Sequence, residues 1–278
     1  MKKKYKLGYC LYLLRGGTLP GRIEFLYENG FRSVAKLQSV DSAKSQECRD
    51  AARLIRELGM TMTCHTNVQG NLKNRRMDPD FARRALADDL WWNEASGGAV
   101  HCCCSDIVSA SDPFEFLMED TVEFAKMRLE TFRGTGILTG IENAPRPEYC
   151  LPEQFAAMKE YSTAMLFDAG HAHISLHTMP QLRGMTLETY LDAIPLPIAE
   201  VHITDNHGER DEHLAPTDGN TDYAALLRGL EKRPETPVIS LEYCKDVRNG
   251  LYAHDITVPE DRDRVLRAMN LLKEIFPA

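Results

Sequence analysis

The stretch that decides the fold is Val201–Tyr223, VHITDNHGERDEHLAPTDGNTDY. It opens as a short apolar run that contains His202, continues as a polar loop, and leads into an amphipathic segment at residues 221–232. The loop contains Asp211 and His213, two residues apart, so their side chains point the same way if the segment is extended. A histidine at a strand end and an Asp-x-His pair in the next loop are ligands that first-row metal sites use. The stretch therefore predicts a strand, a metal-binding loop and a helix, in that order.

The same order of strand and helix recurs along the whole chain, as short apolar runs alternate with longer amphipathic segments. The expected strands are residues 5–10, 32–37, 60–65, 98–103, 136–142, 164–168, 199–203 and 237–242. The expected helices are residues 20–29, 43–58, 79–96, 112–132, 152–161, 186–193, 221–232 and 259–275. Eight such units predict an α/β fold, a (β/α)8 TIM barrel in a single domain over residues 1–278. An open doubly wound sheet is the alternative, and the count of eight units favours the barrel over it.

The composition is typical of a soluble globular protein with a sizeable core. Of the 278 residues, 43% are hydrophobic and 27% are charged, and the formal net charge is −8. This acidic balance argues against a general binder of nucleic acid or of anionic membranes, although it is compatible with a local basic cleft. No run of about 18 apolar residues occurs, so no membrane span is expected. The opening MKKKYKLGYCLYLL lacks a small-residue cleavage site, so it is expected to form the first strand and not a signal peptide.

The chain contains eight cysteines, and none of their spacings is that of a small disulfide-rich domain. Free buried thiols in a reducing cytoplasm are the expected state, which makes a cytoplasmic location the expectation. Three of the cysteines are consecutive, at residues 102–104. They are expected to pack in the wall of the barrel, because alternation along a strand buries some of them, although one thiol could approach a metal.

Polar residues at the expected strand ends are the candidate site, because the active site of such a barrel lies at the carboxyl ends of its strands. Five histidines and four carboxylates fall at these ends or in the loops just after them. They are His65, His101, Glu142, Asp168, His171, His202, Asp211, His213 and Glu242. One metal needs about four such ligands, and nine suffice for two or three ions. Imidazole together with carboxylate suits Zn, Mn, Fe or Co, so the set predicts one to three divalent metal ions.

Each of these residues also has a structural interpretation. A single histidine at a strand end is more often a hydrogen-bonded structural residue than a ligand. Glu142 and the following Asn143 could cap a turn, and residues 168–171 could form a tight turn around Asp168. His65 and His101 are the weakest candidates, because they lie far from the Asp-x-His pair in the sequence. The other histidines are interpreted as solvated or as neighbours of ligands, namely His173, His177, His207 and His254.

Four motifs together resemble a known family. They are IENAP at residues 141–145, FDAGH at residues 167–171, the Val201–Tyr223 stretch and LEY at residues 241–243. With the expected barrel, these motifs resemble the xylose-isomerase-like superfamily, which contains sugar-phosphate isomerases and epimerases as well as endonuclease IV. The resemblance covers nearly the whole chain. It implies a divalent metal, Zn or Mn, as the cofactor and a small carbohydrate as the substrate. Relatives of the isomerase type are commonly dimers or tetramers, so a homo-oligomer is an open expectation.

Two branches of the superfamily imply different ligand sets. In the ketose 3-epimerase branch, one divalent metal is held by four residues, which match Glu142, Asp168, His202 and Glu242. The two glutamates also act there as the acid and base, and the matching His171 helps to hold the substrate. In the endonuclease IV branch, three Zn ions are held by nine residues, and all nine candidate ligands have a match.

The early loops differ from those of the endonuclease IV branch, which uses basic and aromatic residues there to open DNA. The loop QSVDSAKSQ at residues 38–46 has one lysine and no aromatic residue. Val68 and Gln69 occupy the place where an aromatic wedge is expected. Basic residues that could meet phosphate are Lys73, Arg75 and Arg76, but contact with a duplex normally needs several such groups along a track.

Three hypotheses follow. The first is a metal-dependent isomerase or epimerase of a sugar or sugar phosphate, in which Glu142 and Glu242 remove and return a proton beside a metal-chelated carbonyl. Arg146, Arg210 or Lys73 could hold a phosphate. The second is a phosphodiesterase, a hydrolase that resembles endonuclease IV and acts on nucleic acid. The third is a barrel in which the metal has only a structural or ligand-binding role.

Overall fold

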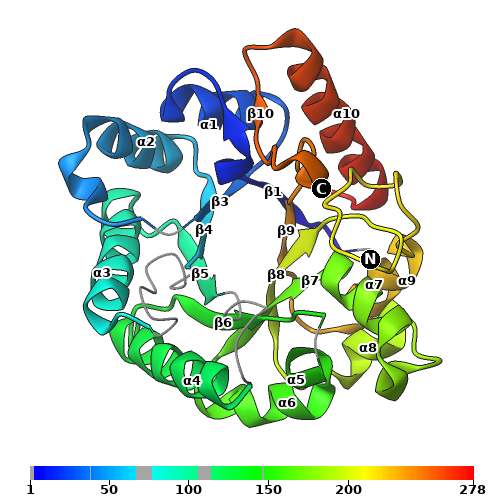
Figure 1. Cartoon of the computed structure of the whole chain (residues 1–278). Coiled ribbons are helices and arrows are strands. Elements are labelled where there is room, and N and C mark those ends of the chain that lie inside the picture. Colours follow the sequence, from blue (N-terminus) through cyan, green and yellow to red (C-terminus); the bar gives the residue numbers. More distant parts are fainter. Residues whose placement is uncertain (1–2, 38, 67–76, 106–113, 146) are drawn as a thin grey trace.

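Eight parallel strands form a closed barrel in the computed structural model, which describes residues 3–37, 39–66, 77–105, 114–145 and 147–278 (Figure 1). The strands, in barrel order, are β1 (Lys6–Cys10), β3 (Ser33–Leu37), β4 (Thr61–His65), β5 (Val100–Ser105), β6 (Leu138–Glu142), β7 (Ala164–Asp168), β8 (Ile198–Ile203) and β9 (Val238–Leu241). The barrel closes where β1 pairs with β9, with Leu7 opposite Ile239. The predicted TIM barrel is therefore confirmed, and the open sheet is excluded.

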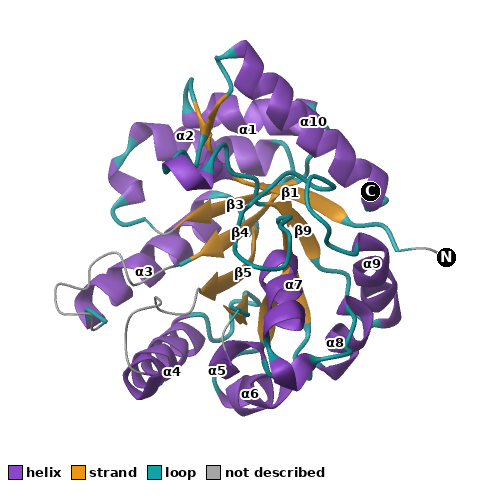
Figure 2. Ribbon diagram, turned by 45° about the vertical axis from the view of Figure 1, so that its right-hand side comes forward, coloured by secondary structure: helices purple, strands orange, loops and turns teal. Residues whose placement is uncertain are grey.

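Helices surround the strands on the outside of the barrel (Figures 1 and 2). They are α1 (Leu19–Glu28), α2 (Gln46–Glu57), α3 (Pro79–Ala95), α4 (Phe114–Thr131), α5 (Pro147–Cys150), α6 (Pro152–Ala157), α7 (Ala169–Thr178), α8 (Leu187–Ala193), α9 (Tyr223–Lys232) and α10 (Pro259–Ile275). Each expected helical segment overlaps one of these helices. Among the described residues, no helix is long and apolar enough to cross a membrane.

Helix α7 is not among the expected helices, and a tight turn was the structural alternative considered for residues 168–171. Asp168 instead caps the helix, and its Oδ1 accepts a hydrogen bond of 2.6 Å from the backbone N–H of His171. Most of the first two turns are buried, including the polar Ser175 as well as Ala172 and Ile174. Because no exposed polar face alternates with an apolar one, hydrophobic periodicity does not reveal this helix.

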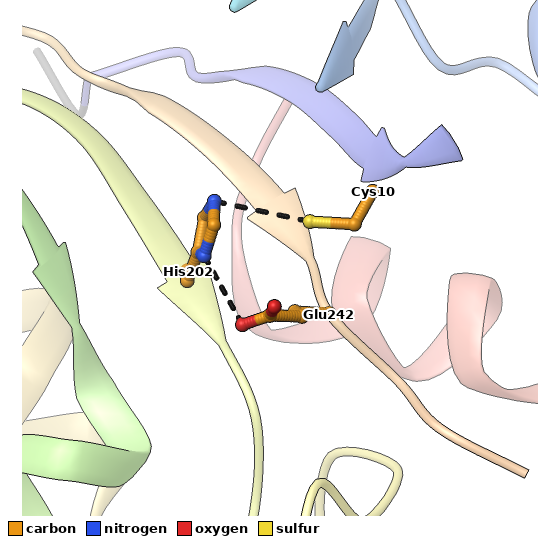
Figure 3. Close-up of side chains that lie close together, drawn as sticks. All are labelled: Cys10, His202 and Glu242. Carbon is orange, nitrogen blue, oxygen red and sulfur yellow. Dashed lines mark hydrogen bonds and ion pairs between the residues drawn. The ribbon is translucent and has the colours of Figure 1, made fainter. Parts of the chain in front are cut away.

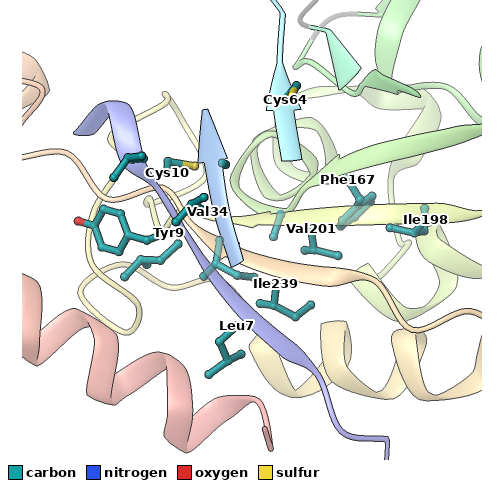
Figure 4. Packing of buried hydrophobic residues seen from close by; sticks show 14 of the residues in the cluster. Leu7, Tyr9, Cys10, Val34, Cys64, Phe167, Ile198, Val201 and Ile239 are labelled. Atoms are coloured by element: carbon teal, nitrogen blue, oxygen red, sulfur yellow. The ribbon is translucent and has the colours of Figure 1, made fainter. Parts of the chain in front are cut away.

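The main hydrophobic core lies between the strands and the surrounding helices. Alternate residues of β8, Val201 and Ile203, point into it and are fully buried, as is Ile239 of β9 (Figure 4). The intervening residues of β8, Glu200 and His202, contact polar groups on other strands. In β8 the period of two along the strand therefore places Val201 and Ile203 in the main core and Glu200 and His202 on the opposite face, inside the barrel.

The cysteines pack as expected, and all eight are free. Cys103 belongs to the main core, whereas Cys102 and Cys104 form a separate small cluster with Ala164 and Leu166. Alternation along β5 thus separates the three consecutive thiols between two apolar clusters. Burial raises the pKa of Cys103 well above its usual value, so this thiol stays protonated and unreactive at neutral pH.

His254 is fully buried, in contrast to its interpretation as a solvated residue or a neighbour of a ligand. It lies in the short strand β10 (His254–Asp255), which pairs with β2 (Leu14–Arg15) beside the barrel. Its imidazole packs on the ring of Tyr243 with centroids 4.4 Å apart. Burial lowers the pKa of His254 to about 4.

This buried histidine predicts a loss of stability in mild acid. The unfolded chain binds the proton with a pKa near 6.5, and the folded protein binds it only near 4. The stabilisation is therefore complete above pH 6.5 and is lost as the pH falls toward 4. We expect His254 to lower the free energy of unfolding by about 2 kcal/mol between pH 7 and pH 4.5. Urea unfolding of the wild type and of His254→Gln at both pH values measures it, because the variant lacks this component. Parallel pH profiles of the two proteins would contradict the prediction.

Candidate metal centre

Four side chains from neighbouring strands converge at the carboxyl end of the barrel. Glu142 is the last residue of β6, Asp168 is the last of β7, His202 is near the end of β8, and Glu242 directly follows β9. One ligand atom from each of the four lies within 4.8 Å of the other three. Glu142, Asp168 and His202 are buried, and Glu242 is only slightly exposed. The fold therefore brings together an oxygen-rich group with one imidazole, from residues that lie at or next to strand ends.

An amide side chain joins the ends of β6 and β7. The Asn143 Nδ2 donates to the backbone carbonyl of Asp168 at 2.9 Å, and the Asn143 Oδ1 accepts from the backbone N–H of Asp168 at 2.8 Å. The backbone carbonyl of Asn143 also lies 2.9 Å from Nδ1 of His171. Asn143 thus fixes the positions of Glu142, Asp168 and His171 relative to each other. From the sequence, Asn143 was interpreted only as a possible cap, although its place in the IENAP motif was a usable signal.

His202 is fixed from both sides of its ring (Figure 3). Its Nδ1 lies 3.1 Å from Oε2 of Glu242, and its Nε2 lies 3.8 Å from the thiol sulfur of Cys10 at the end of β1. The hydroxyl of Tyr12 donates to Oε1 of Glu242 at 2.6 Å. Cys10 and Tyr12 were missed, because nothing in the sequence near them indicates a contact with residues about 200 positions away.

Further predicted ligands border the group of four. The Nε2 of His65 lies 2.8 Å from Oε2 of Glu142, so the end of β4 reaches the same place. Oδ2 of Asp211 lies 3.3 Å from Nε2 of His171 and 2.8 Å from Nε2 of His213. The structure thus brings the Asp-x-His pair to the site. The backbone at His213 has a φ of +47°, so the segment is not extended as expected, and the two side chains meet because the chain turns there.

Asp205 shapes the loop that positions Asp211 and His213. Its carboxylate accepts hydrogen bonds from the backbone N–H groups of Thr217, Gly219 and Thr221, at 2.9, 3.0 and 3.1 Å. A Cβ at Gly219 would lie 2.4 Å from the carbonyl oxygen of Asn206, so only glycine fits there. The loop is therefore closed on itself by buried hydrogen bonds and returns to the barrel mouth.

The structure does not bring His101 to this group. The strand expected at residues 98–103 is Val100–Ser105, so His101 lies near the amino end of β5 and not at its carboxyl end. It lines a cavity of about 380 Å³ with Arg56, Gly97 and Gly136 at that opposite end of the barrel. A ligand at the carboxyl ends of β6–β9 cannot come from this position. We therefore leave His101 out of the proposed site.

Other candidates lie at the rim or outside the described residues. Arg210 is exposed, and its Nε lies 3.4 Å from Oε1 of Glu212. His207 contacts the same carboxylate at 2.6 Å and not the group of four. The phosphate candidates Lys73, Arg75, Arg76 and Arg146, and the loop positions Val68 and Gln69, lie outside the described residues.

The charges of the site support a cation. Burial raises the pKa of Asp168, whose Oδ2 is buried and has no hydrogen-bond partner among the described residues. Burial acts to raise the pKa of Glu242 as well, but the charges of His202 and His213 lower it to about 2. Oδ1 of Asp211 is likewise buried without a partner in the described part of the chain. Buried carboxylate oxygens without donors, beside imidazoles, fit a divalent ion such as Zn or Mn.

Comparison with known proteins identifies the family of the chain. Residues 23–275 match the family model described as xylose isomerase-like TIM barrel. The chain belongs to this family. An uncharacterised protein of Methanocaldococcus jannaschii, MJ1311, is 30% identical over 129 residues, which is 44% of this chain and 41% of that protein. The match thus spans less than half the length of this relative.

Solved structures of the xylose isomerase-like fold cover nearly the whole chain. The D-allulose 3-epimerase from Methylomonas sp. has a TM-score of 0.71 at 13% identity, over 99% of this chain and 100% of that chain. A D-psicose 3-epimerase from Clostridium cellulolyticum H10, crystallised with D-tagatose, has a TM-score of 0.69 at 12% identity, over 98% of this chain and 100% of that chain. At these identities the likeness shows the fold.

Proposed function

We propose that this chain is a divalent-metal-dependent isomerase or epimerase of a sugar or sugar phosphate. The observation that supports it most is the group of four ligand atoms within 4.8 Å, from Glu142, Asp168, His202 and Glu242. Membership of the xylose isomerase-like family and the structural likeness to two ketose 3-epimerases favour this class of reaction.

The four residues would hold one Zn or Mn ion. A bound divalent cation supplies positive charge that polarises the carbonyl and hydroxyl oxygens of a sugar. Asn143 holds Asp168 in place, and Tyr12 donates to Glu242 and so favours its charged form. The three carboxylates are thus held in fixed positions, and the uncharged hydroxyl of Tyr12 donates a hydrogen bond to one of them.

Glu142 and Glu242 are the proposed acid and base. Glu142 ends β6 and Glu242 follows β9, so Asp168 and His202 on β7 and β8 stand between them in barrel order. One carboxylate takes the proton from the carbon next to the substrate carbonyl, and the other carboxylic acid returns a proton to that carbon or its neighbour. Two carboxylates on different sides of the substrate permit inversion at that carbon. His171 contacts the backbone of Asn143 and the carboxylate of Asp211, and it would hold a substrate hydroxyl.

The direct test is an assay of the purified protein with a panel of ketoses and their phosphates. We expect interconversion of at least one pair of epimers or isomers that stops with a chelator and returns with Mn²⁺. Turnover that survives complete removal of metal would contradict the proposed chemistry. No turnover of any sugar, with metal bound at the four residues, would leave the third hypothesis, a metal without a catalytic role.

A phosphodiesterase is the second candidate, and one observation favours it. His65, His171 and His213 each contact a carboxylate of the group of four. Asp211 contacts His171 and His213 beside it, so the site has more possible ligands than one ion needs. With the group of four, these residues make eight of the nine that the resemblance to endonuclease IV implies, and His101 is the one left out. Cleavage of an abasic duplex, with two or three Zn per chain, would support this candidate. No binding of such a duplex at low salt would exclude it.

A further inference from the structure

Glu200 is a buried carboxylate that the proposed chemistry does not use. It lies two residues before His202 in β8, so both side chains point to the interior of the barrel. The side chain of Glu200 is 1% exposed. Its Oε1 lies 3.6 Å from Nε2 of His202, on the side of the imidazole that faces away from Glu242. Glu200 therefore lies directly behind a proposed metal ligand.

Three other strands hold this carboxylate in place. Its Oε1 accepts hydrogen bonds from Thr63 of β4 at 2.8 Å and from Ser240 of β9 at 2.5 Å. The thiol of Cys102, on β5, lies 3.7 Å from Oε2. Gly8 of β1 leaves room for this arrangement, because a Cβ there would lie 2.8 Å from the Ser240 hydroxyl. Residues of four other strands thus bind Glu200 or leave room for it in the barrel interior.

The orientation of the His202 ring determines which of its nitrogens faces the other proposed ligands. The Nδ1 of His202 faces the carboxylates of Glu242 at 3.1 Å and Glu142 at 3.9 Å. The imidazole also stacks on His65, with centroids 5.5 Å apart and planes 21° apart, which restricts rotation of the ring. A neutral imidazole has one N–H and one lone pair, so a proton on Nε2 leaves the lone pair on Nδ1 for a metal.

We propose that Glu200 is a positioning residue that keeps the proton of His202 on Nε2. The lone pair on Nδ1 then points to the metal position beside the other three proposed ligands. The other neighbour of Nε2, the thiol of Cys10 at 3.8 Å, is a weak acceptor and does not replace a carboxylate. Carboxylates in this place orient metal-binding histidines and strengthen their basicity. The inference rests on the proposed function, because the metal centre is itself proposed.

The test is the dissociation constant for Mn²⁺ of metal-free wild type and Glu200→Gln, measured by equilibrium dialysis without substrate. The amide keeps the shape of Glu200 and removes its charge, so we expect the dissociation constant to rise about tenfold to hundredfold. The thermal midpoint of the metal-free variant should not fall, because the substitution removes a buried charge. An unchanged dissociation constant for Mn²⁺ would overturn the inference.

Asp89→Asn is the matched control. Asp89 is also a fully buried carboxylate, and it pairs with Nζ of Lys36 at 2.6 Å, between the strands and α3. Its amide variant leaves Lys36 buried without its charged partner, so we expect lower stability and an unchanged dissociation constant for Mn²⁺. If Asp89→Asn weakens Mn²⁺ binding as much as Glu200→Gln does, the effect is a general loss of packing and the inference is wrong.

A measurement on the wild type keeps the inference testable if Glu200→Gln does not fold. In histidine-labelled protein loaded with Zn²⁺, long-range ¹H–¹⁵N spectra should show His202 bound through Nδ1 with the proton on Nε2. Binding through Nε2 would overturn the inference and leave the metal centre intact. A wild type that binds neither Mn²⁺ nor Zn²⁺ would instead remove the proposed metal centre, and the inference with it.

Discussion

Glu242→Gln should lower the turnover of the sugar substrate by about a thousandfold or more, the usual size of a lost general acid or base. Gln cannot take up a proton, although it keeps the shape of the side chain and can still accept the hydrogen bond of 2.6 Å from Tyr12. Turnover is measured at saturating metal, because Glu242 is also a proposed ligand. Full turnover of Glu242→Gln would rule out the two-carboxylate mechanism.

The remaining glutamate makes this prediction more specific. If Glu142 still removes a proton from its side of the substrate, Glu242→Gln should exchange the substrate's carbon-bound hydrogen with deuterated water while it forms no epimer. Glu142→Gln should likewise exchange the carbon-bound hydrogen without forming an epimer when the other epimer is the substrate. The control is Glu212→Gln, since the carboxylate of Glu212 contacts His207 and Arg248 and not the group of four. We expect near wild-type turnover from this control.

Asp168→Asn should remove the metal and keep the fold. Asparagine is as good an N-cap as aspartate, so α7 keeps the hydrogen bond that Asp168 makes to the backbone N–H of His171. The variant also removes a buried carboxylate whose Oδ2 has no partner among the described residues. We therefore expect the metal-free variant to be at least as stable as the metal-free wild type.

With metal present, the wild type should be more stable than Asp168→Asn. Loss of a charged ligand should weaken Mn²⁺ binding by more than about a hundredfold, beyond the effect of residues that only orient ligands. The wild type gains stability from Mn²⁺ in proportion to the logarithm of its concentration over the dissociation constant, and the variant should gain almost none. Thermal unfolding of both proteins with and without Mn²⁺ measures this. An equal gain in both proteins would show that Asp168 is not a ligand.

The sequence predicts the barrel well because each barrel strand and most of the helices have a local signature. Runs such as residues 164–168 and 199–203 are short and apolar, and amphipathic segments separate them. Each of the eight barrel strands lies within about two residues of its expected range. The convergence of Glu142, Asp168 and Glu242 was predictable for the same reason, since they stand at or directly after strand ends.

The errors have physical causes. Strand β5 is largely buried on both faces, so its sequence does not show where pairing begins. An expected start two residues early placed His101 nearer the carboxyl end of the strand than it is. Helix α7 is buried on most sides and lacks a periodic pattern. The contacts of Cys10 and Tyr12 with His202 and Glu242 bring together the first and last parts of the barrel, and only closure of the barrel makes them.

The most direct test of the proposed metal site is the metal content per chain, measured by elemental analysis of protein purified without chelator and without added metal. We expect about one divalent ion, Mn, Co or Zn, for the four-ligand site, and none in Asp168→Asn. Two or three Zn per chain would mean that His65, Asp211 and His213 are ligands too, and phosphodiester substrates would then be tested before sugars. A correctly folded wild type that contains no metal and takes up none would contradict the account.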